Sequence, residues 1–371
     1  MYSEKLYRPH NPGHDYYAPG IYLITLVVRH RNLQSTLLGR LNDDLKSPKV
    51  LLSEVGEAVL EEWARTPAIQ KTKGNLLTLH SQICMPDHWH GVVEVHAQMN
   101  KSLGHIVQYV KSSCTARWRA ITGSSLDTSS SQAIRHMSEK QRNQYYDSIP
   151  LTQQPLWDDN YDDTICLTDP HGGYDMRHFS AMVRYVDDNP RRAIIRRLRP
   201  QYMQRCLHVR IDGRDYAAFG NMFLLRWARK VQVFCHRKAP DGRTPYETTE
   251  DYRNECQRWE KMILDGATVI VTPGISRGEA QMKDLCLEKG YPLIHLQKEP
   301  IGSYWKPEER RFNACANGML LILAPWKHEE MGDVNGVPSS TAYSMFHNLN
   351  TLAQDICNFD GTAVVVNHQK N

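Results

Sequence analysis

The sequence predicts two folded parts, an α+β domain followed by a Rossmann-like α/β domain. Three observations support this prediction. The 371 residues suffice for two domains of roughly 150 residues or more. Strand and helix patterns occur in mixed order over residues 1–230, and strands alternate regularly with helices after residue 230. We therefore expect a first domain over residues 1–220 and a second over residues 221–371.

The elements of the first part follow from hydrophobic periodicity. A strand is predicted over 22–28, and a helix over 53–65, where Val55, Val59, Leu60 and Trp63 recur at helical spacing. A strand region over 76–95 and a helix that begins near Leu103 come next. Residues 122–154 are rich in Ser, Asp and Gln, which predicts a flexible insertion. A further helix over 175–188 is expected to end before Pro190.

The second part contains short β-rich runs separated by helical patterns. The predicted strands cover 231–235, 267–271, 292–296 and 319–323, and the predicted helices cover 249–264, 277–289 and 307–316. This alternation is typical of a parallel, Rossmann-like sheet.

Composition limits the classes of protein. Hydrophobic residues make up 41% of the chain, enough for two cores, and no run approaches the roughly 18 apolar residues of a membrane span. The first fifteen residues are polar, so we expect no signal peptide and a cytoplasmic protein without a membrane partner. The nine cysteines show no Cys-x-x-Cys spacing, which favours free thiols in a reducing compartment.

Charge is distributed unevenly along the chain. Residues 1–230 carry 30 Lys and Arg against 23 Asp and Glu, a net charge of +7. Residues 231–371 carry 15 against 18, a net charge of −3. The basic character therefore belongs to the first part.

His88, Trp89 and His90 lie in a predicted strand, where side chains alternate between faces. The two imidazoles therefore share one face, and Trp89 points to the other. Two neutral imidazoles on one face can bind a metal ion together. The pattern alone is weak, because 17 histidines in this chain produce a chance His-x-His about once. Two surface histidines are the alternative.

The surrounding residues resemble a known family. The string Met85-Pro86-Asp87-His88-Trp89-His90 resembles the metal motif of HUH nucleases, and specifically that of the single-tyrosine transposases. Three further segments resemble family motifs in the family's order: Lys111-Ser112 with Thr115-Ala116-Arg117, Leu156-Trp157 with Tyr161-Asp162, and Tyr185-Val186-Asp187-Asp188-Asn189-Pro190-Arg191-Arg192-Ala193. Residues 15–205 together resemble the REP-associated tyrosine transposases.

This resemblance implies a fold and a chemistry. The fold would be a ferredoxin-like, RRM-like HUH domain with a central antiparallel sheet. The activity would be cleavage and rejoining of single-stranded DNA at hairpin or repeat sequences through a 5′-phosphotyrosine on Tyr185. A cofactor, Mg²⁺ or Mn²⁺, would be held by His88, His90 and Asn189. The protein would act as a monomer or a homodimer.

Each implied role has an alternative. Asn189 before Pro190 is also a good N-cap residue. Tyr185 could be a core aromatic residue beside Phe179, Met182 and Val183. Glu94 and His96 continue the face of the histidine pair, either as auxiliary ligands or as solvated residues. Rival functions are a domesticated hairpin-DNA-binding protein without cleavage, a replication initiator or relaxase-like nickase of the HUH type, and a nucleotide sensor with a vestigial first half.

Basic side chains are the candidates for contact with the DNA backbone. Seven arginines and no acidic residue lie between Asn189 and Arg210. Arginine suits phosphate contacts, although charge runs are often only solvated faces. The predicted DNA-binding residues are Lys111, Arg117, Arg191, Arg192, Arg196, Arg197 and Arg199.

The loop over 272–279 joins a predicted strand to a predicted helix in the second part. Its glycines and the helix N-terminus could hold a phosphate. The region loosely resembles the Rossmann-like domains of DNA processing protein A and the SLOG group. That resemblance implies a nucleotide or single-stranded DNA as ligand, with Gly274, Ser276, Arg277 and Gly278 nearest the phosphate. A plain turn is the alternative.

Overall fold

A computed structural model describes residues 13–125, 133–134, 136–266, 268–325 and 342–361, with the backbone of short strands at 333–334, 337–338 and 364–366. The chain divides into two compact units, Met1–Ile194 and Ile195–Asn371. Both contain helices and strands, so the predicted mixed α and β class is confirmed. The division lies earlier than residue 220, because strands β7 (Gln204–Ile211) and β8 (Arg214–Gly220) join the sheet of the second unit.

The first unit is built on a four-stranded sheet. Its strands are β1 (Gly20–Val27), β4 (Leu77–Met85), β5 (His88–Val95) and β6 (Asp162–Ile165), in the order β4-β5-β1-β6. All neighbouring strands are antiparallel. A central antiparallel sheet is therefore present, as expected. A two-stranded hairpin of β2 (Gly39–Leu41) and β3 (Val50–Leu52) accompanies it.

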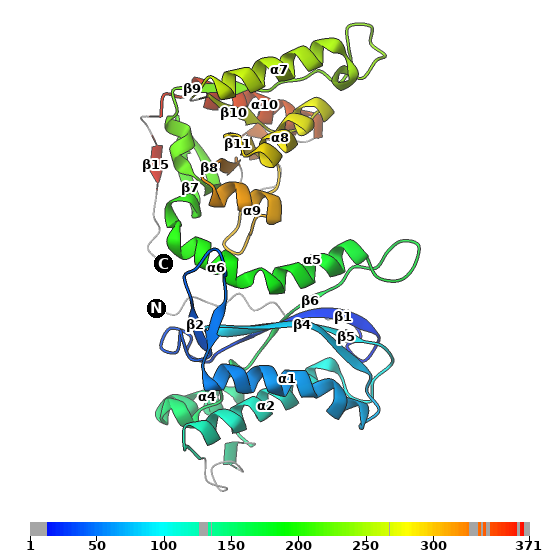
Figure 1. The fold of residues 1–371 in the computed structure, drawn as a ribbon, viewed down its shortest axis with the longest axis vertical. Coiled ribbons are helices and arrows are strands. Elements are labelled where there is room, and N and C mark those ends of the chain that lie inside the picture. Colours follow the sequence, from blue (N-terminus) through cyan, green and yellow to red (C-terminus); the bar gives the residue numbers. More distant parts are fainter. Residues whose placement is uncertain are drawn as a thin grey trace. The chain divides into compact units, whose positions relative to one another are not determined.

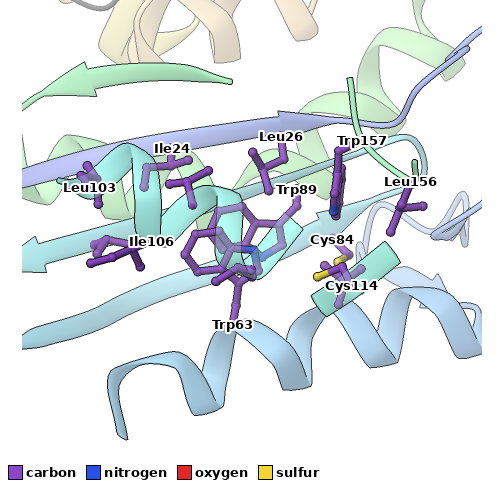
Figure 2. Packing of buried hydrophobic residues seen from close by; sticks show 14 of the residues in the cluster. Ile24, Leu26, Trp63, Cys84, Trp89, Leu103, Ile106, Cys114, Leu156 and Trp157 are labelled. Atoms are coloured by element: carbon purple, nitrogen blue, oxygen red, sulfur yellow. The ribbon is translucent and has the colours of Figure 1, made fainter. Parts of the chain in front are cut away.

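Helices α1 (Glu54–Lys71) and α2 (Leu103–Ile121) lie along one face of this sheet (Figure 1). Ser53 caps α1 by accepting a hydrogen bond from the Gly56 amide. Figure 2 shows the core between these helices and the strands, where the indole rings of Trp63 and Trp89 stack with centroids 4.0 Å apart. Trp63 comes from α1 and Trp89 from β5, so this contact fixes the apolar side of β5.

Helix α5 (Met176–Asp187) covers the opposite face. The Asp175 side chain caps its N-terminus. Met182 and Val186 of α5 pack against Ile21 and Val92 in a small apolar cluster. Helix α6 (Asn189–Leu198) follows directly. The face that the sequence predicts for the two histidines is therefore the face on which α5 lies.

Two helical segments lie in the predicted flexible insertion. Residues 139–148 form helix α4 (Glu139–Ser148), and η1 (Leu151–Gln153) is a 3₁₀ turn. Ser138 and Gln141 form a capping box at the start of α4. The polar composition that predicted a loop is also compatible with a solvated helix, because a helix on the surface needs few apolar positions. The middle of the insertion, residues 126–132 and 135, lies outside the described residues.

The second unit contains a seven-stranded mixed sheet in the order β15-β7-β8-β12-β11-β10-β9. Strands β9 (Arg229–Gln232), β10 (Thr268–Thr272), β11 (Leu293–Leu296) and β12 (Leu320–Ala324) are parallel, and β7, β8 and β15 (Val364–Val366) are antiparallel. Helices α7 (Glu250–Leu264), α8 (Arg277–Lys289) and α9 (Glu309–Ala316) connect the parallel strands. The predicted parallel strands are present, and three antiparallel strands extend the sheet.

Both faces of this sheet are covered. Alternate residues of the parallel strands pack against α7, α8 and α9 on one face, and against α10 (Ala342–Asn358) and η3 (Met222–Arg226) on the other. This double burial explains the continuous apolar run of β12 and the apolar centre of β10, Val269 to Val271. The remaining elements are η2 (Pro200–Tyr202), η4 (Tyr246–Thr248), β13 (Asp333–Val334) and β14 (Val337–Pro338). All nine cysteines are free, and no helix in the described parts of the chain could span a membrane.

Candidate functional site

His88 and His90 lie on the α5 side of strand β5. Trp89 between them is fully buried in the core on the other side, stacked on Trp63. Gly91 is required beside it, because a Cβ atom there would lie 2.2 Å from the Trp89 ring. Core packing of Trp89 thus determines where the two imidazoles point, and their ring centroids are 4.7 Å apart. The predicted shared face is present.

Side chains hold the Nδ1 atom of each imidazole. His88 Nδ1 is 2.5 Å from Asp87 Oδ1, and His90 Nδ1 is 2.8 Å from Thr25 Oγ1. Thr25 lies directly opposite His90 in the pairing of β1 with β5. Burial acts to raise the pKa of Asp87, but the hydrogen bond from His88 and the charges of His88 and Arg31 outweigh it and lower the pKa. Neither Asp87 nor Thr25 was among the predicted site residues.

The two imidazoles supply part of a binding site for a divalent cation. With Nδ1 engaged on each ring, a cation would be bound through the two Nε2 atoms, an arrangement typical of metal-binding histidines. Within the described residues, no group of three or more His, Cys, Asp or Glu side chains is arranged to hold a metal. A site here therefore requires oxygen ligands of another kind, such as an amide, water or a phosphate.

Tyr185 is close to the histidine pair. Its ring centroid lies 5.4 Å from that of His90, in an edge-on arrangement. Tyr185 is half-buried and does not belong to the apolar cluster that contains Met182 and Val186. Helix α5 therefore uses its apolar positions to bind the sheet and presents Tyr185 beside the imidazoles. The structure brings together two residues that are far apart in the sequence.

Asn189 follows at the start of α6 and is 6% exposed. Its Nδ2 donates a hydrogen bond of 3.0 Å to the Tyr185 carbonyl. This bond gives Asn189 a structural role at the junction of α5 and α6. Its Oδ1 is the atom through which it would bind a cation.

Glu94 and His96 form a separate polar group. Glu94 Oε2 is 2.6 Å from His80 Nε2, and Glu94 Oε1 is 3.4 Å from His96 Nδ1. His96 Nε2 is 2.7 Å from Thr78 Oγ1. Because Glu94 and His96 bind each other and their strand neighbours, we interpret them as partly solvated residues and not as auxiliary metal ligands. His80 was not predicted, and sequence spacing offers no signal for it, because it reaches this group only through strand pairing.

Two predicted DNA-binding residues of α2 have partners inside the first unit. Lys111 is 6% exposed, and its Nζ donates to the carbonyl oxygens of Asp158 and Asp159 at 2.6 and 2.7 Å. Burial lowers the pKa of Lys111 to about 8. Arg117 forms ion pairs with Glu61 at 2.9 Å and Glu62 at 3.4 Å. Lys111 therefore anchors the 158–159 segment to α2.

The predicted arginine run does not form one surface. Arg191 pairs with Asp188, and Arg192 is 7% exposed. Arg196 lies over the Phe312 ring at 5.5 Å, and Arg199 Nη1 donates to the Ala316 carbonyl at 2.8 Å.

Two arginines of the run, Arg196 and Arg197, are exposed. The run divides between the two compact units, with Arg191 and Arg192 in the first.

A buried carboxylate closes the predicted phosphate loop of the second unit. Glu279 is 1% exposed, and its Oε2 accepts hydrogen bonds from the amides of Ile275 at 2.7 Å and Ser276 at 3.3 Å. Its Oε1 accepts one from the Cys235 amide at 3.2 Å. The Gly274 amide donates to Thr272 Oγ1. A phosphate bound to these amides would have to displace Glu279.

The other predicted loop residues have local roles. Ser276 caps α8 and forms a capping box with Glu279. The Gly278 carbonyl accepts a hydrogen bond from the Tyr252 hydroxyl, and a Cβ at Gly278 would lie 2.9 Å from the Tyr252 ring. The Arg277 side chain is 85% exposed and 3.8 Å from Glu247. Gly274 has a φ of +65°, which favours glycine.

Comparisons with known proteins find likeness among solved structures alone. No protein-family model matches the chain, and no curated protein sequence matches it. Seven chains of solved structures match. One of them is a REP-associated tyrosine transposase bound to a REP hairpin; it is 10% identical, covers 48% of this chain and 70% of its own, and has a TM-score of 0.26. A TM-score of this size does not establish a shared fold.

Proposed function

We propose that the first unit cleaves and rejoins single-stranded DNA, with Tyr185 as the nucleophile and with Mg²⁺ or Mn²⁺ bound by His88 and His90. The observation that carries this proposal is the 5.4 Å separation of the Tyr185 and His90 rings on the face where both imidazoles lie. A tyrosine that could act as nucleophile and two imidazoles that could bind a cation lie together on one face of the sheet. A tyrosine hydroxyl can attack a phosphate, and a cation held by the imidazoles would stabilise charge on the phosphate oxygens.

The order of elements in the first unit supports the proposal. Strands β1, β4, β5 and β6 are connected through α1 and α2 as β-α-β-β-α-β, and their spatial order is β4-β5-β1-β6. This connectivity is that of the ferredoxin-like arrangement. Two of the motifs that resemble the single-tyrosine transposases lie on this arrangement, one at the turn from β4 to β5 and one on α2, and the motif that contains Tyr185 lies after it on α5 and α6.

The residues would act in the following way. The Tyr185 hydroxyl oxygen attacks the scissile phosphorus and its proton passes to water. The bond from phosphorus to the 3′ oxygen breaks, and that oxygen takes up a proton, which leaves a free 3′-hydroxyl and a 5′-phosphotyrosine. Rejoining is the reverse attack of a 3′-hydroxyl, so the reaction needs no nucleotide cofactor. When bound, the cation supplies positive charge to the phosphate oxygens. Asp87 and Thr25 orient the imidazoles that hold it.

Single-stranded DNA with a hairpin is the proposed substrate. Residues 195–230, which follow the first unit, carry nine Lys and Arg against two Asp and Glu, and this basic segment favours association with a polyanion. The half-buried position of Tyr185 between α5 and the sheet suits a flexible strand better than a duplex, because a single strand can bend to place one phosphate there. For the second unit we propose a nucleotide or a short single strand as ligand, which would compete with Glu279 for the loop amides.

The test is an assay for a covalent adduct. The full-length protein is incubated with a panel of single-stranded hairpin oligonucleotides and Mn²⁺ or Mg²⁺, then analysed on denaturing gels. We expect an adduct for the wild type, and none for Tyr185→Phe, which lacks only the hydroxyl. Tyr174→Phe is the matched control and should retain the adduct.

The metal assignment is tested in the same assay. His88→Ala and His90→Ala should each lose cleavage, and His96→Ala should retain it. Full activity in excess chelator would contradict the proposed cation. Hairpin binding by the wild type without any adduct would favour the alternative of a binding protein that does not cleave.

A further inference from the structure

Asp87 lies between His88 and Arg31 at the turn that joins β4 to β5. Its Oδ1 binds His88 Nδ1 at 2.5 Å, and its Oδ2 accepts a hydrogen bond from Arg31 Nε. The Asp87 and His88 side chains are 14% and 17% exposed. A carboxylate that binds a different partner with each oxygen cannot rotate without breaking a bond. The two contacts together therefore restrict both the carboxylate and the imidazole.

The backbone on both sides of this contact is held independently. The Asp87 carbonyl accepts a hydrogen bond from the Val28 amide, and the Pro86 carbonyl accepts one from the Leu38 amide, each at 3.0 Å. Arg31 follows His30, whose φ of 52° places it in the left-handed region. The Gln34 amide donates a hydrogen bond of 3.1 Å to the His30 carbonyl, which closes this turn. Arg31 and Asp87 thus meet because two fixed turns bring them together.

We infer that Asp87 and Arg31 are positioning residues for His88, an inference that rests on the proposed function. Asp87 accepts the Nδ1 hydrogen of the neutral imidazole and so leaves the lone pair on Nε2, where a cation would bind. Arg31 holds Asp87 in that orientation. Thr25 Oγ1 contacts His90 Nδ1 with a neutral hydroxyl, which can donate as well as accept and therefore restricts the His90 tautomer less than a carboxylate would.

Arg31 has a second consequence for the site. A carboxylate beside the scissile phosphate would repel it, because two negative charges close together interact unfavourably. The guanidinium of Arg31 offsets this charge while Asp87 keeps its bond to His88. An Asp-Arg pair can therefore orient the metal ligand without making the site more negative. A lone aspartate could not do both.

The experiment uses the full-length protein and two readouts. Nitrogen-15 NMR of labelled histidine reports the tautomer of His88 without any metal. Titration with Mn²⁺, followed by electron paramagnetic resonance of the free ion, reports affinity. The variants are Asp87→Leu, Asp87→Asn, Arg31→Gln and the matched control Arg40→Gln, which replaces another exposed arginine. Circular dichroism checks that each variant is folded.

We expect the wild-type His88 to carry its hydrogen on Nδ1. Asp87→Leu should give a mixture of tautomers and weaken Mn²⁺ binding by about 10–100-fold. Asp87→Asn should retain the tautomer in part, because the amide oxygen can still accept from Nδ1. Arg31→Gln should weaken binding by less than Asp87→Leu, and Arg40→Gln should not change it.

Three results would overturn the inference in distinguishable ways. If Mn²⁺ binding is lost in His88→Ala but is unchanged in a folded Asp87→Leu variant, the positioning role is wrong and the metal site stands. If Mn²⁺ binding is unchanged in His88→Ala, the metal site itself is wrong and the inference falls with it. An Nε2-protonated His88 in the wild type would also contradict it.

Discussion

Trp63 and Trp89 stack with their ring planes 7° apart and their centroids at 4.0 Å. Trp89 lies between the two histidines in the sequence but points to the opposite face of β5. The stack therefore connects the packing of α1 to the orientation of the candidate metal ligands. Whatever disturbs the core on one face of the sheet should also disturb the site on the other.

Replacement of Trp63 tests this connection. Trp63 is 2% exposed, so Trp63→Ala should lower the free energy of unfolding by about 3–5 kcal/mol through loss of buried area and formation of a cavity. Chemical denaturation measures the change. Leu33→Ala is the control, since Leu33 is 74% exposed and should change stability little. Equal effects of the two substitutions would show that the stack does not support the sheet.

Lys111 should make stability depend on pH in the alkaline range. Its pKa is lowered from 10.5 to about 8 by burial. Between these two values the unfolded chain binds a proton that the folded chain does not, so this residue's contribution to stability rises with pH, by at most about 1.4 kcal/mol per pH unit. Denaturation at pH 7.5 and 9.5 should show the rise in the wild type relative to Lys111→Met. A constant difference would contradict the lowered pKa.

The arginine run should separate into two classes of effect. The double variant Arg196→Gln with Arg197→Gln should weaken binding of single-stranded DNA and reduce the slope of log affinity against log salt by about 0.7 for each phosphate that is no longer neutralised. Arg199→Gln should instead lower stability, because Arg199 bonds the Ala316 carbonyl. Fluorescence anisotropy over a salt series and thermal melts distinguish the two. An unchanged slope in the double variant would mean that these arginines are only a solvated face.

Glu279 should exclude phosphate from the loop of the second unit. Glu279→Ala leaves three backbone amides without their acceptor and should cost about 2 kcal/mol or more. Inorganic phosphate should then raise the melting temperature of the variant more than that of the wild type, at constant ionic strength. Glu288→Ala, an exposed position on the same helix, is the control. Equal stabilisation of the wild type by phosphate or by a nucleotide would show that the loop binds anions as it stands.

Several features could be predicted from the sequence because they depend on local periodicity. Alternation along a strand placed His88 and His90 on one face, and helical spacing located α7 and α8 close to their observed limits. The start of α1 was predicted to within one residue, but the helix continues six residues beyond the predicted end. The β-α alternation predicted the four parallel strands. Asp87 could have been identified too, because it directly precedes His88 in the sequence and its carboxylate can reach the neighbouring Nδ1.

Other features depended on tertiary structure. Strands β7 and β8 were missed, since their place in the second sheet depends on β8 pairing with β12, about a hundred residues later. The burial of Lys111 depends on the carbonyls of Asp158 and Asp159, which only chain packing brings to its ammonium group. Glu279 can bind the loop amides only because α8 begins close to Cys235, which follows β9.

The candidate site divides in the same way. The order of residues shows that His88 and His90 share a face, because side-chain direction along a strand repeats every two residues. It does not show that Tyr185 lies beside His90, because that distance depends on how the apolar positions of α5 pack against Ile21 and Val92. Local geometry follows from neighbouring residues, whereas the meeting of distant residues follows from the packing of whole elements.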